Sequence, residues 1–336
     1  MKKTFCLLLA AVMLLALGAC GGGTEPAPAP GTDAPATGAP TGTETYTIGL
    51  IQQLQHPALD LATEGFQDAL TELLGDAVTI NVQNASNETA NCATIVADFV
   101  ASNVDLIMAN ATTALQAAVA ATGDIPILGT SITEYGVALG IDGFTGVTGY
   151  NVSGTSDLAP LDQQAAMILE WFPEAKTVGL LYCSAEPNSQ YQVDNVQATL
   201  EAAGVTCTQY SFADSNDLSA VATNACNNSD VVYIPTDNTC ATNAELIGSI
   251  ALDTKTPIIT GEEGIATGCG VATLTISYYD IGYKTGEMAY EILVNGADVS
   301  TMPIEYAPQF TPKYNPTMCE ALGLTPPSDE YVAIGA

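Results

Sequence analysis

The fold is decided by the pentapeptide TIGLI at residues 47–51, which recurs as TVGLL at residues 177–181, 130 positions later. The same offset aligns Pro57 with Pro187, with no gap between the two matches. Both pentapeptides are short apolar runs containing β-branched residues, which is typical of strands buried in a parallel sheet. The repeat predicts two lobes of similar fold.

Strands and helices alternate on either side of these pentapeptides. The hydrophobic spacing predicts strands over 46–51, 78–82, 104–108 and 126–128, and helices over 59–74, 88–101 and 112–121. A second set of echoes follows, because DLI at 105–107 parallels DVV at 230–232, and PIL at 126–128 parallels PII at 257–259. The pattern predicts an α/β protein made of two doubly wound parallel-sheet lobes joined by crossover strands.

The predicted lobes are discontinuous in sequence. We assign residues 45–149 and 277–302 to lobe 1, and residues 150–276 and 303–336 to lobe 2 and a C-terminal crossing. The chain is expected to cross between lobes at 145–151, 271–277 and 303–310, and a helix at 281–293 is expected to pack on lobe 1. Such crossings allow hinge closure around a ligand.

The N-terminus has the pattern of an export signal. Lys2 and Lys3 precede an apolar run at 5–17, which is short for a transmembrane helix. The run ends in LGAC at 17–20, which resembles a bacterial lipobox and predicts lipidation of Cys20; the alternative is an ordinary signal peptide with a chance cysteine. Residues 21–44 are mainly Gly, Pro, Ala and Thr, which predicts a disordered tether.

Charge and composition exclude several functions. The chain has six lysines, no arginine and 37 acidic residues, for a net charge of −31. This argues against nucleic-acid binding and against phosphate ligands held by arginine forks. A single histidine and the absence of a C-x-x-C pair argue against a zinc site, and no cofactor motif is present. Seven cysteines remain after Cys20, and the sequence leaves open whether they form disulfides or stay thiols.

Candidate ligand contacts come from the loops that follow predicted strands. In doubly wound sheets the ligand lies at the carboxyl ends of the strands. His56, the single histidine, follows the first strand and is either a ligand contact or a helix cap. Thr112 and Thr113 open a helix, where hydroxyls and free amides bind a carboxylate without arginine; simple capping is the alternative.

The matching loops of lobe 2 supply acidic and amide groups. Asp237, with Asn238 beside it, follows a strand and is expected to contact a ligand ammonium, or else to cap the helix predicted at 241–252. Glu262 and Glu263 follow the next strand, and one of them is expected in the pocket. The remaining candidates are Gln53, Thr133, Tyr150, Ser184, Glu186 and Asn188, whereas Tyr135 is expected to pack near a crossing.

Several of these segments resemble the TrpX-like family of ABC-transporter substrate-binding proteins. The resemblance covers nearly all of residues 45–325 and is most specific at HPALD (56–60) and at the DNT loop that begins at Asp237. It also includes ATTALQ (111–116), VTG (147–149), LYCS (181–184) and SYYDIG (277–282). This sequence departs from the family at CSAEP (183–187) and GEEG (261–264), so the ligand's identity does not carry over directly.

The resemblance implies a type I periplasmic-binding fold with three crossovers and an amino-acid ligand, which is aromatic for some members. The implied function is an extracytoplasmic, lipid-anchored solute-binding protein, expected as a monomer, that delivers its ligand to an ABC permease. A sensing receptor of the same fold and a binder of cationic or other small solutes remain alternatives. An enzyme is disfavoured, because one histidine and scattered cysteines leave few ways to build a nucleophile–base pair.

Overall fold

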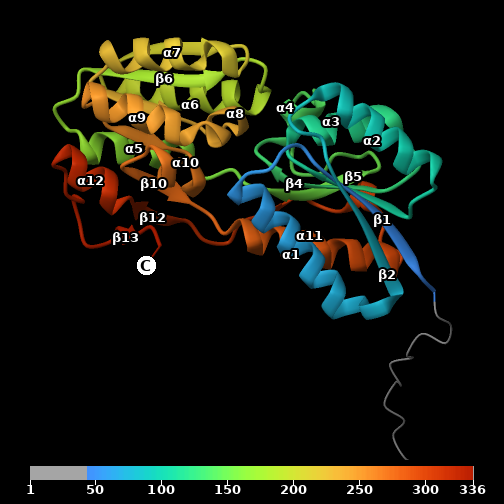
Figure 1. The fold of residues 1–336 in the computed structure, drawn as a ribbon. Coiled ribbons are helices and arrows are strands. Elements are labelled where there is room, and N and C mark those ends of the chain that lie inside the picture. Colours follow the sequence, from blue (N-terminus) through green and yellow to red (C-terminus); the bar gives the residue numbers. More distant parts are fainter. Residues whose placement is uncertain (1–43, 336) are drawn as a thin grey trace, which may run out of the picture. The chain divides into compact units, whose positions relative to one another are not determined.

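The computed structural model describes residues 44–335, so the predicted signal segment, Cys20 and almost all of the predicted tether lie outside the described residues. Within this range the chain forms two α/β lobes, each with helices on both faces of a sheet (Figure 1). The predicted fold class is confirmed. No helix among the described residues is long and apolar enough to span a membrane.

The sheet of lobe 1 has six strands in the order β11-β5-β4-β3-β1-β2, and all neighbouring pairs are parallel. Its strands are β1 (Tyr46–Gln52), β2 (Val78–Asn84), β3 (Leu106–Asn110), β4 (Ile127–Ile132), β5 (Val152–Ser156) and β11 (Glu305–Tyr306). Its helices are α1 (Pro57–Leu74), α2 (Thr89–Ala101), α3 (Thr112–Ala121), α4 (Tyr135–Leu139) and α11 (Tyr278–Leu293), with short 3-10 turns η1 (Gly75–Ala77) and η2 (Val299–Thr301).

The sheet of lobe 2 has seven strands in the order β13-β12-β10-β9-β8-β6-β7. Its strands are β6 (Thr177–Cys183), β7 (Thr206–Phe212), β8 (Val231–Ile234), β9 (Ile258–Thr260), β10 (Ala272–Thr275), β12 (Thr311–Tyr314) and β13 (Val332–Ala333). Its helices are α5 (Leu161–Trp171), α6 (Pro187–Ala202), α7 (Ser215–Asn227), α8 (Asn238–Thr242), α9 (Ala244–Thr254), α10 (Glu263–Gly268) and α12 (Pro316–Leu322). The helix predicted over 241–252 is therefore two helices, α8 and α9.

The internal repeat in the sequence corresponds to the same strand order in the two lobes. TIGLI lies in β1 and TVGLL in β6, and the local orders β2-β1-β3-β4 and β7-β6-β8-β9 are the same. Alternate residues of β1 face opposite layers of helices: Leu50 packs in a cluster with Phe66 of α1, whereas Ile51 packs in a cluster with Phe99 of α2. Because helices cover both faces of the sheet, the centre of the strand, residues 48–51, is a continuous buried run without polar side chains, and this run predicted the strand.

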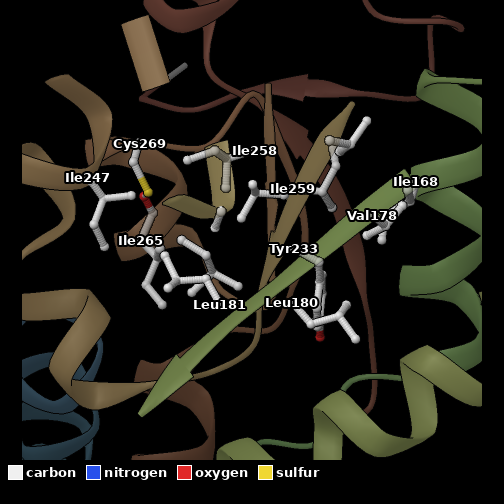
Figure 2. Close-up of a cluster of buried hydrophobic side chains, with 14 of the residues drawn as sticks. Ile168, Val178, Leu180, Leu181, Tyr233, Ile247, Ile258, Ile259, Ile265 and Cys269 are labelled. Atoms are coloured by element: carbon white, nitrogen blue, oxygen red, sulfur yellow. The ribbon is translucent and has the colours of Figure 1, made fainter. Parts of the chain in front are cut away.

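One large apolar cluster holds the central strands of lobe 2 together. Figure 2 shows Leu180 and Leu181 on β6, Tyr233 on β8 and Ile259 on β9 within this cluster, and all four side chains are buried. The Tyr233 hydroxyl donates a hydrogen bond to Gln164 of α5, so the one polar atom of this side chain is satisfied inside the core.

Two of the predicted lobe boundaries are wrong. Residues 145–151 do not cross to lobe 2, because the following strand β5 pairs with β4 in the sheet of lobe 1. The segment is instead a loop that turns at Gly146 and Gly149, both of which have positive φ angles. At the other end, β11 also pairs with β5, so residues 305–306 belong to lobe 1 rather than lobe 2.

The chain crosses between lobes at three places, as predicted in number. It leaves lobe 1 between β5 and α5, returns between β10 and α11, and crosses again between β11 and β12, at residues 307–310. The last two crossings lie within the predicted segments 271–277 and 303–310. The helix predicted at 281–293 is α11, and it packs on lobe 1 as expected.

Helices α1 and α11 approach each other unusually closely (Figure 1). Glycines lie at the contact: a Cβ at Gly282 would overlap the carbonyl of Ala62, and one at Gly65 would overlap the carbonyl of Tyr279. Gly286 in turn packs on the side chain of Ala69. The two backbones are therefore in direct contact, with no large side chain between them.

We predict that Gly282→Ala destabilises the protein although alanine is the better helix former. Propensity alone would stabilise the helix by about 1 kcal/mol, but the overlap with the Ala62 carbonyl forces the helices apart at a typical cost of about 1–3 kcal/mol. The free energy of unfolding, measured by urea titration, is expected to fall. Gly123→Ala is the control, because a Cβ added at Gly123 would have no other atom within 4 Å; a stabilised Gly282→Ala would contradict the direct backbone contact.

Candidate functional site

Buried polar side chains gather at the carboxyl ends of the strands in both lobes. In lobe 1 they lie at the end of β4 or just after β1, β3, β4 and β5, and in lobe 2 they follow β6, β8 and β9. This is the edge of a doubly wound sheet at which ligands bind. The buried members are Gln53, His56, Thr112, Ser131, Thr133, Asp157, Glu186, Asn188, Asp237, Thr239 and Glu262.

The N-terminus of α3 is partly occupied by the protein itself. The Gln53 side chain accepts a hydrogen bond from the Thr113 amide at 3.0 Å and donates one to Asn87 at 3.0 Å. Gln53 therefore caps the helix rather than presenting a free amide group. Thr112 is buried beside it at the first position of the helix, so it remains a candidate for contact with an anionic group.

Asp157, which follows β5, is a buried acid of the site with one carboxylate oxygen that is not hydrogen-bonded within the part of the chain that the structure describes. Its side chain is 4% exposed, and its Oδ2 accepts a hydrogen bond from the Tyr278 hydroxyl at 3.0 Å. Its Oδ1 has no hydrogen-bond partner among the described residues. Burial raises the pKa of this carboxyl to about 6, against the opposing hydrogen bond from Tyr278. An external cation placed at Oδ1 would stabilise the ionised form.

Ser131 near the end of β4 carries a second unsatisfied group. Its hydroxyl is buried and, within residues 44–335, has no hydrogen-bond partner. Its φ angle of 55° lies in the left-handed region, which is uncommon for serine, and the register of β4 against β5 shifts at this point. Backbone strain of this kind concentrates at ligand-binding sites.

Glu186 in lobe 2 is saturated by neutral donors. Its Oε2 accepts from the amide and the side chain of Asn238, at 3.0 and 2.7 Å, and its Oε1 accepts from the amide and the hydroxyl of Thr239, at 2.9 and 2.8 Å. Burial, followed by the nearby charge of Asp237, raises the pKa of Glu186 to about 7, while these donors lower it.

Asp237 caps α8 and ties it to the neighbouring strand. Its Oδ1 accepts from the Cys240 amide at 2.8 Å, and its Oδ2 accepts from the Cys183 amide at 2.7 Å. Burial raises its pKa. Because both oxygens are already bound to the backbone, the geometry favours the capping role over contact with a ligand ammonium. Asn188 lies close by, and its amide nitrogen donates to the Thr236 carbonyl at 3.1 Å.

Glu262 and Glu263 have different environments. Glu262 is buried and caps α10 by accepting from the amides of Gly264 and Ile265; burial raises its pKa to about 7 against these two donors. Glu263 is partly exposed and forms an ion pair with Lys313 at 2.7 Å. Of the two, only Glu262 belongs to the buried set.

Two cavities open between side chains of both lobes. One, of about 970 Å³, is lined by His56, Pro57 and Ala58 from lobe 1 and by Glu262 from lobe 2, with Tyr278 at the crossing. The other, of about 950 Å³, has more polar walls. They include Gln53, Asn87, Thr113, Cys183, Glu186 and Asn216. The buried polar cluster is thus flanked by an apolar opening and a polar one.

Two predicted site residues lie elsewhere. Tyr150 is 58% exposed and precedes β5, so it lies near the amino end of the strand, opposite the ligand edge; the prediction is wrong because it depended on a crossing at residues 145–151. Ser184 is exposed, and its hydroxyl donates to the Phe212 carbonyl at 3.1 Å, so it belongs to the turn after β6. Tyr135 is buried in the core of lobe 1 and donates to the Thr155 carbonyl.

Asp157, Ser131 and Tyr278 were missed as site residues. Asp157 satisfies the same rule that selected His56 and Asp237, because it directly follows a strand, and only the misplaced crossing hid it. The left-handed conformation of Ser131 leaves no signal in the sequence. Tyr278 lies at the start of α11, beyond any strand of lobe 1, so only the crossing at 276–277 brings it to Asp157.

The described residues contain no group of three or more His, Cys, Asp or Glu side chains arranged to hold a metal ion. The seven cysteines in this range are all thiols, and every one except Cys207 is buried. Burial raises the pKa of Cys183, beside Asp237, to about 11, so this thiol is a poor nucleophile at neutral pH.

The class of protein follows from this fold and from the comparison with known families. The chain belongs to the ABC transporter substrate binding protein family, which it matches over residues 47–333. It is therefore an extracytoplasmic ligand-binding component of an ABC importer, in a family of binding proteins rather than enzymes. The resemblance seen in the sequence is confirmed.

Three proteins of known name or structure are similar to this chain over most of its length. The tyrosine-binding protein of Clostridioides difficile strain R20291 is 35% identical over 260 residues, 76% of this chain and 75% of the relative. An ABC domain from Streptococcus pneumonia in complex with L-Trp is 32% identical, with a TM-score of 0.78 and coverage of 83% and 95%. A ligand-free, open substrate-binding protein with adhesive properties from Clostridium difficile is 36% identical, with a TM-score of 0.67 and coverage of 86% and 99%. The present structure superposes better on the L-Trp complex although that chain is less identical.

We predict that Asp157→Asn stabilises the ligand-free protein above pH 6. The folded pKa of about 6 exceeds the unfolded value, so the folded state binds this proton more tightly, and the free energy of unfolding falls as pH rises from about 4 to 7. Asparagine removes this penalty, which is at most about 3 kcal/mol, and still accepts from Tyr278. Urea titrations at pH 5 and pH 8 measure the difference.

Asp230→Asn is the control with the opposite sign. Its carboxylate accepts hydrogen bonds from the amides of Lys176 and Thr177, which lower its pKa, so its contribution is present at neutral pH and is lost as pH falls through the folded pKa. Asp230→Asn is expected to lower stability at pH 8. An Asp157→Asn protein that is less stable than wild type at pH 8 would contradict the account of Asp157.

Proposed function

We propose that this protein is a lipid-anchored receptor for an amino acid with an aromatic or apolar side chain, which it captures between its lobes and delivers to an ABC importer. The observation that carries the proposal is Asp157, a buried carboxylate with one free oxygen in a chain without arginine. Such a group calls for a cation from outside the protein, and an α-ammonium fits this need. The tyrosine and L-Trp ligands of two relatives support the same ligand class.

The ligand carboxylate is proposed to lie at the start of α3. Thr112 and the free hydroxyl of Ser131 are neutral donors at neighbouring strand ends of lobe 1. Helix N-termini bind anions through their amides and their dipole, so arginine is not required. Gln53 and Thr133 are assigned to the walls that hold these groups in place.

The ligand side chain is proposed to extend toward the apolar cavity. Ala58, Ile276 and Tyr278 line this cavity and also pack together in one buried cluster. Tyr278 presents an aromatic ring to the space while its hydroxyl is held by Asp157. An aromatic or branched side chain gains burial against this wall, whereas a ligand carboxylate here would face the buried Glu262.

The protein is proposed to act as a monomer, without a cofactor and without catalysis. The buried acids are held by backbone amides, hydroxyls or side-chain amides rather than by a base positioned for proton transfer. The membrane anchor is proposed at Cys20, because LGAC at residues 17–20 follows a basic start and a short apolar run. Two or more acyl chains would make such an anchor stable.

We predict that tyrosine, tryptophan or a branched amino acid raises the thermal midpoint of the wild-type protein and that Asp157→Asn abolishes the shift. Removing one partner of a buried charge pair typically costs about 2–5 kcal/mol, so the affinity measured by calorimetry should fall by more than about thirtyfold. Asp230→Asn, on the far edge of lobe 2, is the matched control and should bind normally. If Asp237→Asn removes binding and Asp157→Asn does not, the ammonium has been assigned to the wrong lobe.

We predict that Cys20→Ser moves the protein from the membrane fraction to the soluble fraction outside the cell. Serine has no thiol to acylate, so incorporation of radiolabelled palmitate should be lost together with membrane association. Cell fractionation and labelling of the full chain test this. A Cys20→Ser protein that remains in the membrane fraction would rule out a lipid anchor at this residue.

A further inference from the structure

Among residues 44–335, a hydrogen bond between two side chains joins the two lobes directly at the site. His56 Nε2 of lobe 1 lies 3.2 Å from Asn238 Oδ1 of lobe 2. His56 ends the loop before α1, and Asn238 is the first residue of α8. The histidine is buried, and its side chain makes no hydrogen bond to the helix that it precedes. The His56 ring therefore hydrogen-bonds to lobe 2 and does not cap the helix of its own lobe.

Glu186 fixes the orientation of the Asn238 side chain. The Asn238 Nδ2 donates to Glu186 Oε2 at 2.7 Å, and the Asn238 backbone amide donates to the same oxygen at 3.0 Å. The other oxygen, Oε1, holds the amide and hydroxyl of Thr239. With Nδ2 committed to Glu186, the Asn238 carbonyl oxygen is the group that remains for His56, so Nε2 must be the protonated ring nitrogen.

The same contacts leave little capacity for a ligand at Glu186. Four donors come from Asn238 and Thr239 at the start of α8, two on each oxygen, and Asn188 Nδ2 adds a longer contact of 3.5 Å to Oε2. A ligand ammonium would have to displace one of them, whereas Asp157 offers a free oxygen. Glu186 therefore acts on the cleft through Asn238 and not through the ligand.

We propose that Glu186, Asn238 and His56 form a latch between the lobes, in which Glu186 is a positioning residue that presents the Asn238 carbonyl to His56 in the arrangement of the lobes described above, whether or not a ligand is bound. The proposal rests on the proposed function in one respect, that the lobes close over a small ligand. The latch stabilises the closed state, so it affects how slowly the ligand leaves.

The single histidine of the chain makes the latch directly observable. Nitrogen-15 NMR of the imidazole distinguishes the Nε2–H and Nδ1–H tautomers, and with a histidine-free affinity tag His56 gives the only such signals. Burial lowers the pKa of His56, so the ring is neutral at pH 8. In the ligand-free full chain at pH 8 we expect the Nε2–H tautomer in the wild type and its loss in Asn238→Ala and Glu186→Gln.

Glu186→Gln tests orientation rather than charge alone. Glutamine has one acceptor oxygen, and its own NH₂ group would meet donors of Asn238 or Thr239, so the Asn238 amide is released. Glu170→Gln is the matched control: Glu170 in α5 accepts from the Tyr331 hydroxyl and does not contact Asn238. The proposal is overturned if wild-type His56 is the Nδ1–H tautomer, or if Glu186→Gln and wild type give the same spectrum.

Release kinetics provide the second test, with L-tyrosine as the probe. His56→Ala should release it about three- to tenfold faster, the range expected for one lost neutral hydrogen bond, and His56→Gln, which keeps a donor at a similar reach, should restore part of the slow release. Glu186→Gln should accelerate release to a similar extent in the wild-type background and have no further effect in His56→Ala.

Additive effects of the two substitutions would overturn the latch, because a merely structural Glu186 would act independently of His56. The two proposals fail separately. If the wild type binds no amino acid, the ligand assignment fails while the tautomer spectra still decide the latch. If amino acids bind and Glu186→Gln leaves the His56 spectrum unchanged, only the latch fails.

Discussion

The site is governed by one constraint: its buried carboxylates must be stabilised without arginine. The chain has none, and Lys313, at the rim, is engaged by Glu263. Glu186, Asp237 and Glu262 meet the constraint with backbone amides and neutral side chains. The backbone amides at the starts of α8 and α10 are therefore already hydrogen-bonded to these carboxylates, whereas free amides at a helix N-terminus could bind an anion. The amides of α8 and α10 are thus not available to a ligand carboxylate, which is why we propose the start of α3 in lobe 1 for that group. Asp157 is the exception, and its unsatisfied oxygen is the reason why we propose a cationic group of the ligand at this position.

Much of the fold could be predicted because the repeat at 47–51 and 177–181 marks equivalent strands, and strands covered on both faces are apolar throughout. The crossings were harder. The stretch 145–151 has the Gly, Val and Thr content of an extended linker, but its glycines serve a turn before β5. The lobe to which β5 belongs is decided by its pairing partners, β4 and β11. Because β11 lies far along the chain, the composition of residues 145–151 cannot predict this pairing.

The site residues that could be predicted are those that directly follow a strand. Gln53, His56, Thr112, Glu186 and Asp237 follow strands, so the topology alone brings them to one edge. Their roles could not be predicted, since capping and ligand contact use the same residue types in the same loops. The contacts of Asp237 with Cys183 and Cys240 favour the cap, and those of Gln53 do the same for α3. Tyr150 was misplaced and Asp157 overlooked for one shared reason, the crossing assigned one strand too early.

The close contact of α1 and α11 gives the site a mechanical basis. His56 immediately precedes α1, and Tyr278 is the first residue of α11. Gly65 and Gly282 bring the two backbones together, so the helices move as one body, and the two side chains at their N-termini move with them. The crossing at 276–277 leads directly into α11. Because both helices belong to lobe 1, we expect a rotation at this crossing to move His56 against Asn238 of lobe 2, while Tyr278 keeps its place beside Asp157.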